Sequence, residues 1–448
     1  MYVVGTFLVV IYHTYFLPFF LLFSSHGSNL GHYLKDFDFT LIVNMGISIE
    51  AYFLFSGILL AYPRFRRQEK KVNIRIIKLI VRRYIRLCPS LLLILGIIVA
   101  LPLLGSGPVY ADIFEAAADN TRKWWWTYAL MFNNFLPVKD QNFLYLWFIP
   151  CLMQITIVGA LFLWLIAKFP KFGIFVTIAA GIICNIIVGV QTALKHFPPT
   201  YSIYYYHDRE YFEEPIYTAP LNHVLTYGIG MILGYYMAKN PVLKWSKKHV
   251  VFGWIVSLLL TVGVQLVCYV WHEGLQPDPV AAAIYAATHR TAFTLGLAWI
   301  ILACTHGYGG AFAKILSWKG FVPLSKLGYF GYLIHYIVIT HHVSMARVPL
   351  MYSHYEVWMR FCGYSFLTFL SAFVLYITFE QPLVSIESLF WPRRPDDSAS
   401  QIHLPRNIKV SDLVVVKHSD NEAENSMRPS SNGSSLSRRE ATDEHSRL

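Results

Sequence analysis

Charged residues are scarce in this sequence. Asp, Glu, Lys and Arg together make up only 14% of its 448 residues, whereas a water-soluble domain of ordinary composition carries about 25%. Hydrophobic residues account for 55% of the chain and aromatic residues for 16%. This balance excludes an ordinary soluble globular domain and predicts a protein that crosses a membrane several times.

Patterns that would bind metal or nucleic acid are also missing. The six cysteines lie within or beside apolar runs, with no Cys-x-x-Cys pair and no Cys/His ligand spacing, so we expect neither a disulfide nor a metal site. The net charge of +11 comes from short Lys/Arg clusters between apolar runs rather than from a basic domain, which argues against a nucleic acid partner. Residues 1–24 lack the basic start and small-residue cleavage site of a signal peptide. The cysteines are Cys88, Cys151, Cys184, Cys268, Cys304 and Cys362.

Ten apolar segments are long enough to span a bilayer, which takes about 20 helical residues. They predict an all-α fold, a polytopic membrane helical bundle of about ten transmembrane helices. In the sixth segment, Gly230 and Gly234 predict a close contact with another helix. Residues 124–136 are aromatic but too short to span, so we expect them at the membrane interface. The ten segments are 1–24, 41–62, 75–104, 144–167, 172–193, 219–238, 249–272, 280–304, 323–345 and 359–382.

The linkers between these segments divide into a more basic and a less basic set. One alternate set carries thirteen Lys and Arg residues and the other seven. The more basic set is expected in the cytoplasm, which places both termini inside and residues 194–218 outside. Residues 391–448 are polar and almost free of aromatics, so we expect a disordered cytoplasmic tail after a transmembrane domain of residues 1–390.

Four predicted spans carry ionisable side chains at a similar depth. With a rise of about 1.5 Å per residue, His13 and His335 lie near the middle of their spans, as do Glu50 and the His289-Arg290 pair. Such groups are costly in lipid, by roughly 2.5 to 3.5 kcal/mol for Asp, Lys or Arg on insertion scales. Their common depth predicts one polar cavity with a functional role. The alternative is structural pairing, for example of Glu50 with Arg290, which would hold helices in register.

A basic cluster, VRRYIRLCP at residues 81–89, opens the third span on the predicted cytoplasmic side. Arg83 and Arg86 are three residues apart and share a helix face. Because the planar guanidinium binds phosphate oxygens in pairs, we expect these two arginines to form an anion clamp for a cytoplasmic phosphate-bearing donor such as coenzyme A. The alternative is ordinary flanking charge.

Eight short stretches, in order along the chain, resemble one known family. Together they cover roughly residues 1 to 390, and the order of the eight is more specific than any one of them. The chain resembles the acyltransferase 3 superfamily of multi-pass membrane proteins, and within it the animal nose-resistant-to-fluoxetine type. The stretches are VVIYHTY (9–15), SIEAYFLFSGILLAY (48–62), RRYIRLCP (82–89), LWFIPCLMQ (146–154), YGIGMILGYYM (227–237), HRTAFTLGLAWIILACTHGYGG (289–310), LSWKGFVPLSKLGYFGYLIHYIVI (316–339) and FEQP (379–382).

The resemblance implies O-acyl transfer from acyl-CoA to a hydroxyl acceptor, which could be a lipid. The first-span histidine, here His13, would be the general base, and Arg83 and Arg86 would hold the donor. No GxSxG nucleophile motif is present. We place His335 and Glu50 with His13 as catalytic residues around the expected chamber, and Arg290 with the substrate-binding residues. Acyl-CoA is then a substrate and no bound cofactor is expected; the other partners are membrane lipids of the plasma membrane or an endomembrane.

The sequence departs from the superfamily in three places. Tyr2 stands where an arginine usually precedes the first-span histidine, and Leu152 stands where an acidic residue usually precedes Gln154. Fluoxetine-type proteins also usually carry an extracellular N-terminal domain, so the chain is expected to be N-terminally truncated relative to the family. These departures favour a second hypothesis, a member with reduced catalysis that acts in lipid or xenobiotic transport. The sequence indicates neither the acceptor nor the acyl chain length.

Overall fold

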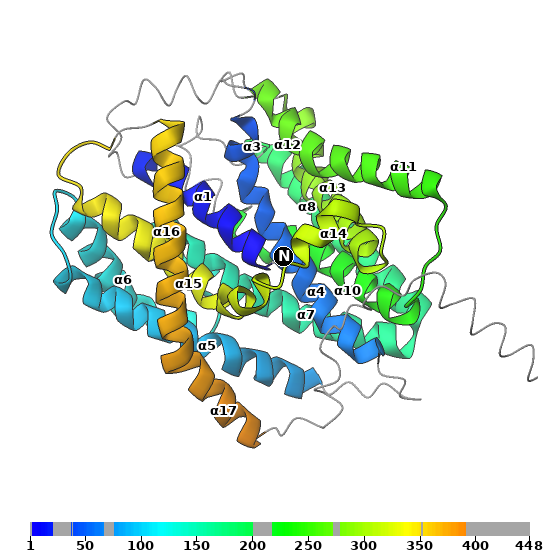
Figure 1. Cartoon of the computed structure of the whole chain (residues 1–448), viewed down its shortest axis with the longest axis horizontal. Helices are drawn as coiled ribbons and strands as arrows, with labels where there is room; N and C mark the ends of the chain where they lie inside the picture. Colours follow the sequence, from blue (N-terminus) through cyan, green and yellow to red (C-terminus); the bar gives the residue numbers. More distant parts are fainter. Residues whose placement is uncertain are drawn as a thin grey trace, which may run out of the picture. The chain divides into compact units, whose positions relative to one another are not determined.

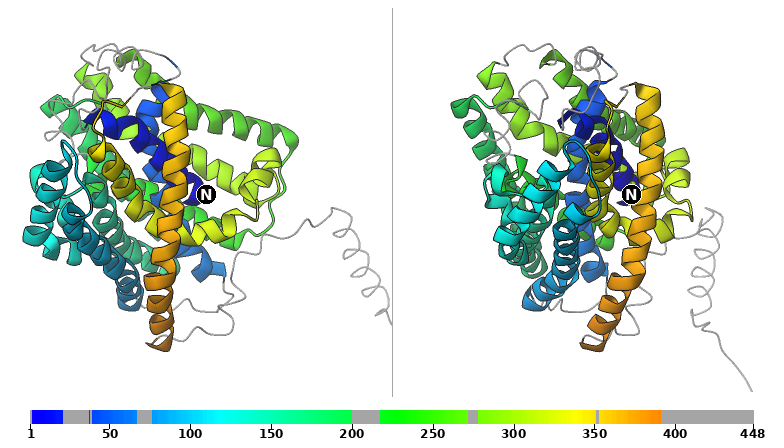
Figure 2. Two further views of the ribbon diagram at one scale, coloured as in Figure 1. Left: turned by 60° about the vertical axis from the view of Figure 1, so that its left-hand side comes forward. Right: turned by 90° about the vertical axis from the view of Figure 1, so that its left-hand side faces the viewer.

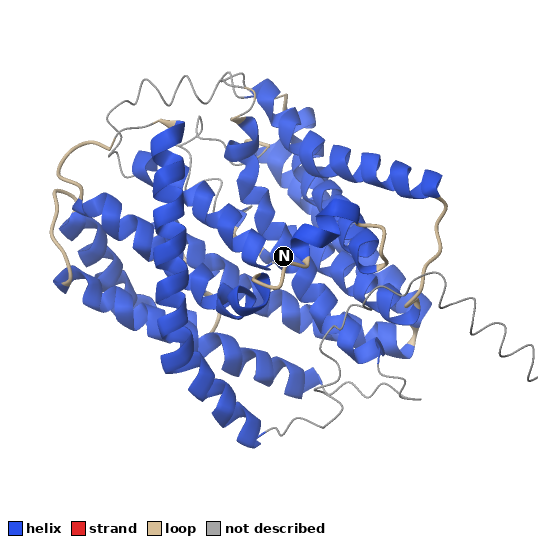
Figure 3. Cartoon of the chain, viewed as in Figure 1, coloured by secondary structure: helices blue, strands red, loops and turns tan. Residues whose placement is uncertain are grey.

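The computed structural model describes residues 2–20, 37, 39–66, 76–199, 217–271, 278–350 and 353–390. These residues form helices joined by turns and short loops, and none of them forms a strand (Figure 3). They all belong to one compact unit, Met1–Asp396. The second unit, Asp397–Leu448, and the predicted tail of residues 391–448 lie outside the described residues. The predicted all-α bundle is confirmed.

Eight helical segments in the described part are long and apolar enough to cross a membrane. They coincide with eight of the ten predicted spans. The remaining two, 1–24 and 219–238, contain the helices α1 and α10, with 19 and 16 described residues. They are not among the eight segments, so the predicted count of ten is not established. The eight segments are Thr40–Arg66, Ile76–Leu103, Leu144–Lys168, Pro170–Lys195, Lys247–Trp271, Pro279–Thr305, Phe321–Met345 and His354–Leu389.

The longer helices follow these segments closely. Each is a run of apolar residues with few breakers, and short 3₁₀ or π turns mark several ends. Their bounds are α1 Tyr2–Phe20, α3 Thr40–Val43, α4 Ile49–Arg66, α5 Ile76–Ala100, α6 Tyr110–Ala129, α7 Phe148–Lys168, α8 Pro170–Lys195, α10 Val224–Lys239, α11 Lys247–Leu258, α12 Val264–Leu266, α13 Pro279–Thr305, α14 Gly310–Leu316, α15 Phe321–Met345, α16 His354–Leu375 and α17 Gln381–Phe390.

Three of the long helices are more enclosed than the others. In the segments of α4, α7 and α15 more than half of the apolar window is buried, whereas less than a quarter is buried in those of α11 and α16. Helices α1, α15 and α16 pack against one another, with α16 on the outside of that group (Figures 1 and 2). The large apolar side chains that α8, α11, α13 and α16 expose are those expected to face lipid.

Helix α6 lies in a stretch that the sequence placed between spans. Its buried side, which includes Tyr110, Phe114 and Tyr128, faces the protein, and α5 packs against it. Trp125 and Trp126 near its end are exposed by 53% and 41%. The aromatic segment 124–136 is thus the end of an amphipathic helix and the turn after it, and its place at the interface stays a prediction.

Glycines bring α4 and α10 into direct backbone contact. A methyl group on Gly57 would lie 2.3 Å from the carbonyl oxygen of Tyr227, and one on Gly230 would lie 2.2 Å from that of Leu54. A methyl group on Gly234 would meet the carbonyl oxygen of Ile58 at 2.9 Å. Since real Cβ atoms do not approach so closely, only glycine allows this packing. The close helix contact predicted for α10 is confirmed.

A short 3₁₀ helix comes directly before each of the helices α4, α7 and α10, which surround the candidate site. The 3₁₀ helices are η1 Asn44–Ser48 before α4, η5 Leu144–Trp147 before α7 and η8 Pro220–His223 before α10. A 3₁₀ helix turns more tightly than an α-helix and often ends or starts one. These 3₁₀ helices place Ser48, Trp147 and His223 at the starts of α4, α7 and α10, where the candidate site lies.

Candidate functional site

The two histidines predicted at mid-span meet each other. Helix α1 carries His13 and helix α15 carries His335, and these helices pack together. Nδ1 of His13 lies 3.1 Å from Nε2 of His335, and the two rings are 5.0 Å apart between centroids. His335 is completely buried, and His13 is partly buried. Two helices that are remote in sequence therefore place an imidazole pair between them.

Neighbouring carbonyl groups determine where the ring hydrogens lie. Nδ1 of His335 is 2.6 Å from the carbonyl oxygen of Tyr332, and Nδ1 of His13 is 3.0 Å from that of Val9. A carbonyl oxygen only accepts, so both rings in their neutral form carry the hydrogen on Nδ1. Nδ1–H of His13 then also faces Nε2 of His335, which accepts. This tautomer makes Nε2 the nitrogen of His13 that can take up a proton.

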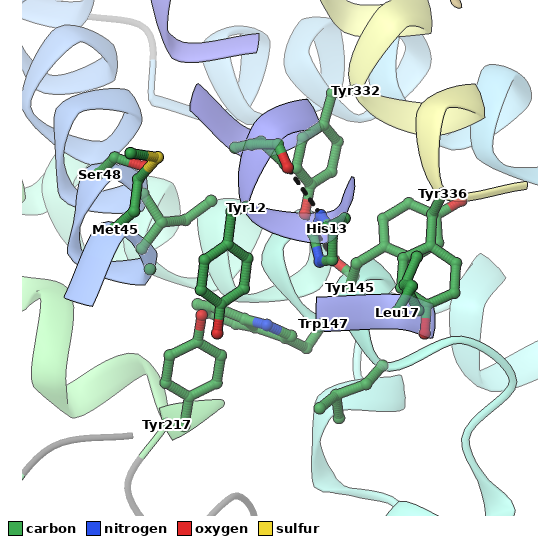
Figure 4. A pocket seen from close by; sticks show the side chains of 14 residues that line it. Tyr12, His13, Leu17, Met45, Ser48, Tyr145, Trp147, Tyr217, Tyr332 and Tyr336 are labelled. Atoms are coloured by element: carbon green, nitrogen blue, oxygen red, sulfur yellow. Dashed lines mark hydrogen bonds between the residues drawn. The ribbon is translucent and has the colours of Figure 1, made fainter. Parts of the chain in front are cut away.

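His13 forms part of the wall of a partly open cavity of about 70 Å³ (Figure 4). In the close-up, His13 stands between Tyr12 and Tyr336, with Trp147 and Tyr217 on the side below them. The cavity lies where α1, η1, η5 and α15 come together. No Asp, Glu, Lys or Arg belongs to its lining among the described residues. The lining residues are Val9, Tyr12, His13, Leu17, Met45, Gly46, Ser48, Ile49, Leu144, Tyr145, Trp147, Tyr217, Tyr332 and Tyr336.

Hydrogen bonds to the backbone fix two of the lining tyrosines. The hydroxyl of Tyr332 donates to the carbonyl oxygen of Tyr145, and the hydroxyl of Tyr145 donates to that of Leu333, both at 2.5 Å. The rings of Tyr145 and Tyr336 are stacked, with centroids 4.7 Å apart. These bonds tie η5 to α15 and leave the tyrosine rings as fixed parts of the cavity wall.

Two other predicted site residues, Glu50 and Arg290, belong to a second cluster, behind Trp147. Glu50, at the start of α4, lies with Oε1 2.7 Å from Nδ1 of His223 and 3.6 Å from Nε of Arg290 on α13. Glu50 and His223 are almost completely buried. The His223 ring stacks on Phe53, with centroids 4.3 Å apart, and on Trp147 at 5.3 Å. Trp147 belongs to the cavity wall, so the buried ionic cluster supports that wall from behind.

The ionisable groups that we expected at one depth thus divide into two clusters. His13 and His335 form one, and Glu50 with Arg290 forms the other; of these four, only His13 lines the cavity. The pairing of Glu50 with Arg290 is the structural alternative that the sequence allowed. His223 was not foreseen. Its signal was a histidine near the start of the predicted span 219–238, too close to the end of that span for a depth argument to select it.

The two arginines of α5 lie apart from the cavity. A guanidinium nitrogen of Arg83 donates to the hydroxyl of Ser56 on α4. Arg86, whose side chain is 65% exposed, has its guanidinium 3.9 Å from the buried carboxylate of Glu380 in the π turn Tyr376–Glu380. The two arginines therefore turn toward different neighbours, and binding of a donor between them stays a prediction.

Histidine, cysteine and carboxylate side chains do not gather into a metal-binding group within the described ranges. All six cysteines are free thiols. The arrangement can instead perform acid–base chemistry: an imidazole at a cavity wall, with a second imidazole behind it to accept its Nδ1–H. The eight spanning segments and this enclosed polar centre define an integral, multi-pass membrane protein.

Comparison with known proteins identifies the family. A family model described as an acyltransferase domain matches residues 3–377, so the chain belongs to the acyltransferase 3 family. The chain is also 25% identical over 390 residues to "Nose resistant to fluoxetine protein 6" of Caenorhabditis elegans. That match covers 80% of this chain but 46% of the relative, so the chain spans about half the length of that protein. No solved structure matches the chain.

Proposed function

We propose that the protein is a membrane-bound O-acyltransferase that moves an acyl group from acyl-CoA to the hydroxyl of an acceptor held in the cavity beside His13. One observation carries the proposal: in a chain of the acyltransferase 3 family, His13 lines a cavity and its Nδ1–H faces a buried imidazole acceptor, Nε2 of His335. This is the arrangement that a general base needs, because the second group orients the ring and stabilises its protonated form.

The reaction needs no covalent enzyme intermediate. Nε2 of His13 takes the proton of the acceptor hydroxyl as its oxygen attacks the thioester carbonyl carbon. The tetrahedral adduct then breaks its C–S bond, and the CoA sulfur leaves with the proton from the imidazolium. The products are an ester and free CoA, and the base returns to its neutral state. Base catalysis of this kind contributes typically about 10² to 10⁴ in rate.

The remaining predicted residues receive separate proposed roles. Arg83 and Arg86 would bind donor phosphates, for which their planar guanidinium groups are suited. Glu50 was placed among the catalytic residues and Arg290 among the substrate-binding ones. Their contacts with each other and with His223 favour a positioning role, in which they hold Trp147 in the cavity wall.

The purified protein in lipid nanodiscs, supplied with acetyl-CoA and a membrane lipid extract, tests this function. CoA release would be followed with a thiol reagent and the acylated product by mass spectrometry. We expect release above the protein-free rate together with a new ester. Absence of both, with lipid still bound or moved between vesicles, would reject acyl transfer and support the transport hypothesis.

A further inference from the structure

We infer that Arg82 and Arg86 on α5 form a binding site for a phosphate-bearing ligand, and that the acidic helix α17 covers this site until the ligand displaces it. The inference rests on the donor binding in the proposed function and adds Arg82 and a regulatory cover to it. It follows from two ion pairs, from the exposure of both arginines, and from the way α17 is attached.

Two carboxylates close to the end of the bundle face two arginines of α5. Nε of Arg82 lies 2.5 Å from Oε1 of Glu387 on α17. A guanidinium nitrogen of Arg86 lies 3.9 Å from Oε1 of Glu380, in the π turn before α17. Because Arg82 and Arg86 are four residues apart, they are neighbours on one face of α5. The pair is therefore spaced to hold one anionic ligand, and a carboxylate stands before each member.

Both arginines remain open to solvent. The side chain of Arg82 is 46% exposed and that of Arg86 is 65% exposed. The 3.9 Å between Arg86 and Glu380 is too long for a hydrogen bond. Arg83 differs, because its guanidinium donates to the hydroxyl of Ser56 on α4. An anion from solution can thus reach Arg82 and Arg86, whose planar guanidinium groups suit phosphate oxygens.

Helix α17 is attached in a way that allows it to move. The π turn Tyr376–Glu380 separates it from α16, and Pro382, at its second position, cannot donate a backbone hydrogen bond. Such features kink helices, and π turns often lie at functional sites. None of residues 381–389 is buried, and α17 reaches past the other helices at one end of the bundle (Figure 2). Its position therefore depends on the ion pair between Glu387 and Arg82.

A phosphate-bearing ligand can compete with this contact. An ion pair with a half-exposed member contributes little to stability, because water competes for the charges. A phosphate group carries more charge and more acceptor oxygens than one carboxylate, and it can bond to Arg82 and Arg86 together. Glu387 then moves into water with α17, while the buried Glu380 stays behind Arg86. The closed arrangement lowers the apparent affinity of the site, since the ligand must first open it.

Hydrogen exchange of α17 shows whether a ligand displaces it. Coenzyme A or a soluble short-chain phosphatidic acid would be added to the protein in phosphatidylcholine nanodiscs. We expect at least one of them to speed amide exchange in residues 381–389 and to leave exchange in α1 unchanged. Acceleration by coenzyme A alone identifies the donor as the source of the phosphate, and acceleration by phosphatidic acid identifies a lipid head group. If neither compound speeds exchange in α17, the inference is overturned.

The compound that opens α17 is then titrated into matched variants. Glu387→Gln removes the competing carboxylate and should bind it about two- to fivefold more tightly, the range that an exposed ion pair allows. Arg82→Gln should bind it about tenfold more weakly. The control, Glu356→Gln, breaks the ion pair with Arg360 near the start of α16 and should keep the affinity. Unchanged affinity in either Glu387→Gln or Arg82→Gln would contradict the inference.

Adding acetyl-CoA and the lipid extract separates this inference from the proposed function. If α17 opens and Glu387→Gln binds the ligand more tightly but no ester forms, acyl transfer is rejected while the covered anion site stands. If esters form, yet exchange in α17 and affinity in Glu387→Gln do not change, acyl transfer stands and the cover is rejected.

Discussion

Nδ1 of His223 lies 2.7 Å from Oε1 of Glu50, and both side chains are 1% exposed. This contact joins the start of α10 to the start of α4 and continues through the stacked ring of Trp147 to the wall of the cavity. Through one tryptophan side chain the ionic cluster thus reaches the cavity that His13 also lines. A change at the buried cluster should consequently affect both stability and the shape of the acceptor site.

Glu50→Gln should strongly destabilise the protein. Removing one member of a buried ion pair leaves the other charge uncompensated, which costs about 3 to 5 kcal/mol, and Arg290 is only 13% exposed. Thermal unfolding in detergent measures the effect. Glu50→Gln/Arg290→Gln should recover part of the loss. Asp119→Asn, which breaks the exposed pair with Arg122, is the control and should shift unfolding little; an equally small shift in Glu50→Gln would contradict the prediction.

Gly57→Ala and Gly230→Ala should separate α4 from α10. Each added methyl group would collide with a backbone carbonyl oxygen of the other helix, and overpacking typically costs about 1 to 3 kcal/mol. The matched control is Gly363→Ala on α16, where an added methyl group meets nothing within 4 Å, and alanine should stabilise the helix slightly. Unfolding temperatures that fall equally in all three variants would show that contact with α10 is not the cause.

Arg83→Lys/Arg86→Lys should weaken binding of acyl-CoA by about tenfold or more, because point charges replace two planar groups that can each bond a phosphate twice. Equilibrium binding of labelled CoA to the purified protein measures this. Arg122→Lys, on the surface of α6, is the control. CoA affinity equal to the unaltered protein in a folded double-alanine variant would show that the two arginines are only flanking charges.

The orientation of the chain can be tested by cysteine labelling in intact cells, in a variant without the six native cysteines. Thirteen basic residues on one set of linkers against seven on the other predict that both termini are cytoplasmic. A membrane-impermeant reagent should then label cysteine at position 202 and spare cysteine at position 244. The reverse pattern would invert the orientation and place the α5 arginines on the outer side.

The sequence predicted most of the fold because a bilayer imposes a simple rule. Long apolar runs must be helices whose backbone groups are bonded internally, so segments such as 144–167 could be located without tertiary information. Length alone does not decide whether α1 and α10 cross the membrane. Helix α6 was missed because it is amphipathic and mixes Asp119, Arg122 and Lys123 with aromatics, a pattern that hydropathy does not select.

Side chains expected to lie near one another do so where the helices are continuous. His13 and His335 lie on unbroken α1 and α15, so counting residues along each helix correctly brought them together. Glu50 was counted along one helix of residues 41–62, whereas η1 interrupts that segment and puts Glu50 at the second position of α4. Its contact with His223 depends on how two helix starts meet in space, and no local pattern in the sequence encodes that meeting.

The aromatic walls of the cavity illustrate the same limit. Tyr145 and Trp147 follow an unremarkable loop, and Tyr332 and Tyr336 look like ordinary apolar positions of a span. Hydrogen bonds between η5 and α15, together with stacking of Tyr336 on Tyr145 and of Trp147 on His223, bring them into one wall. A residue whose function comes from a contact between distant segments carries no distinguishing signal in one sequence.

The central claim, that His13 is the general base, is tested most directly by the rate of acyl transfer in His13→Gln. Glutamine keeps the approximate size and some hydrogen bonding but cannot take up the proton, so the rate should fall by about 10² to 10⁴ while CoA affinity and unfolding temperature stay near those of the unaltered protein. His342→Gln, which changes a histidine of α15 bonded to Tyr364 outside the cavity lining, should retain the rate. A folded His13→Gln protein that transfers acyl groups at the unaltered rate would contradict the account.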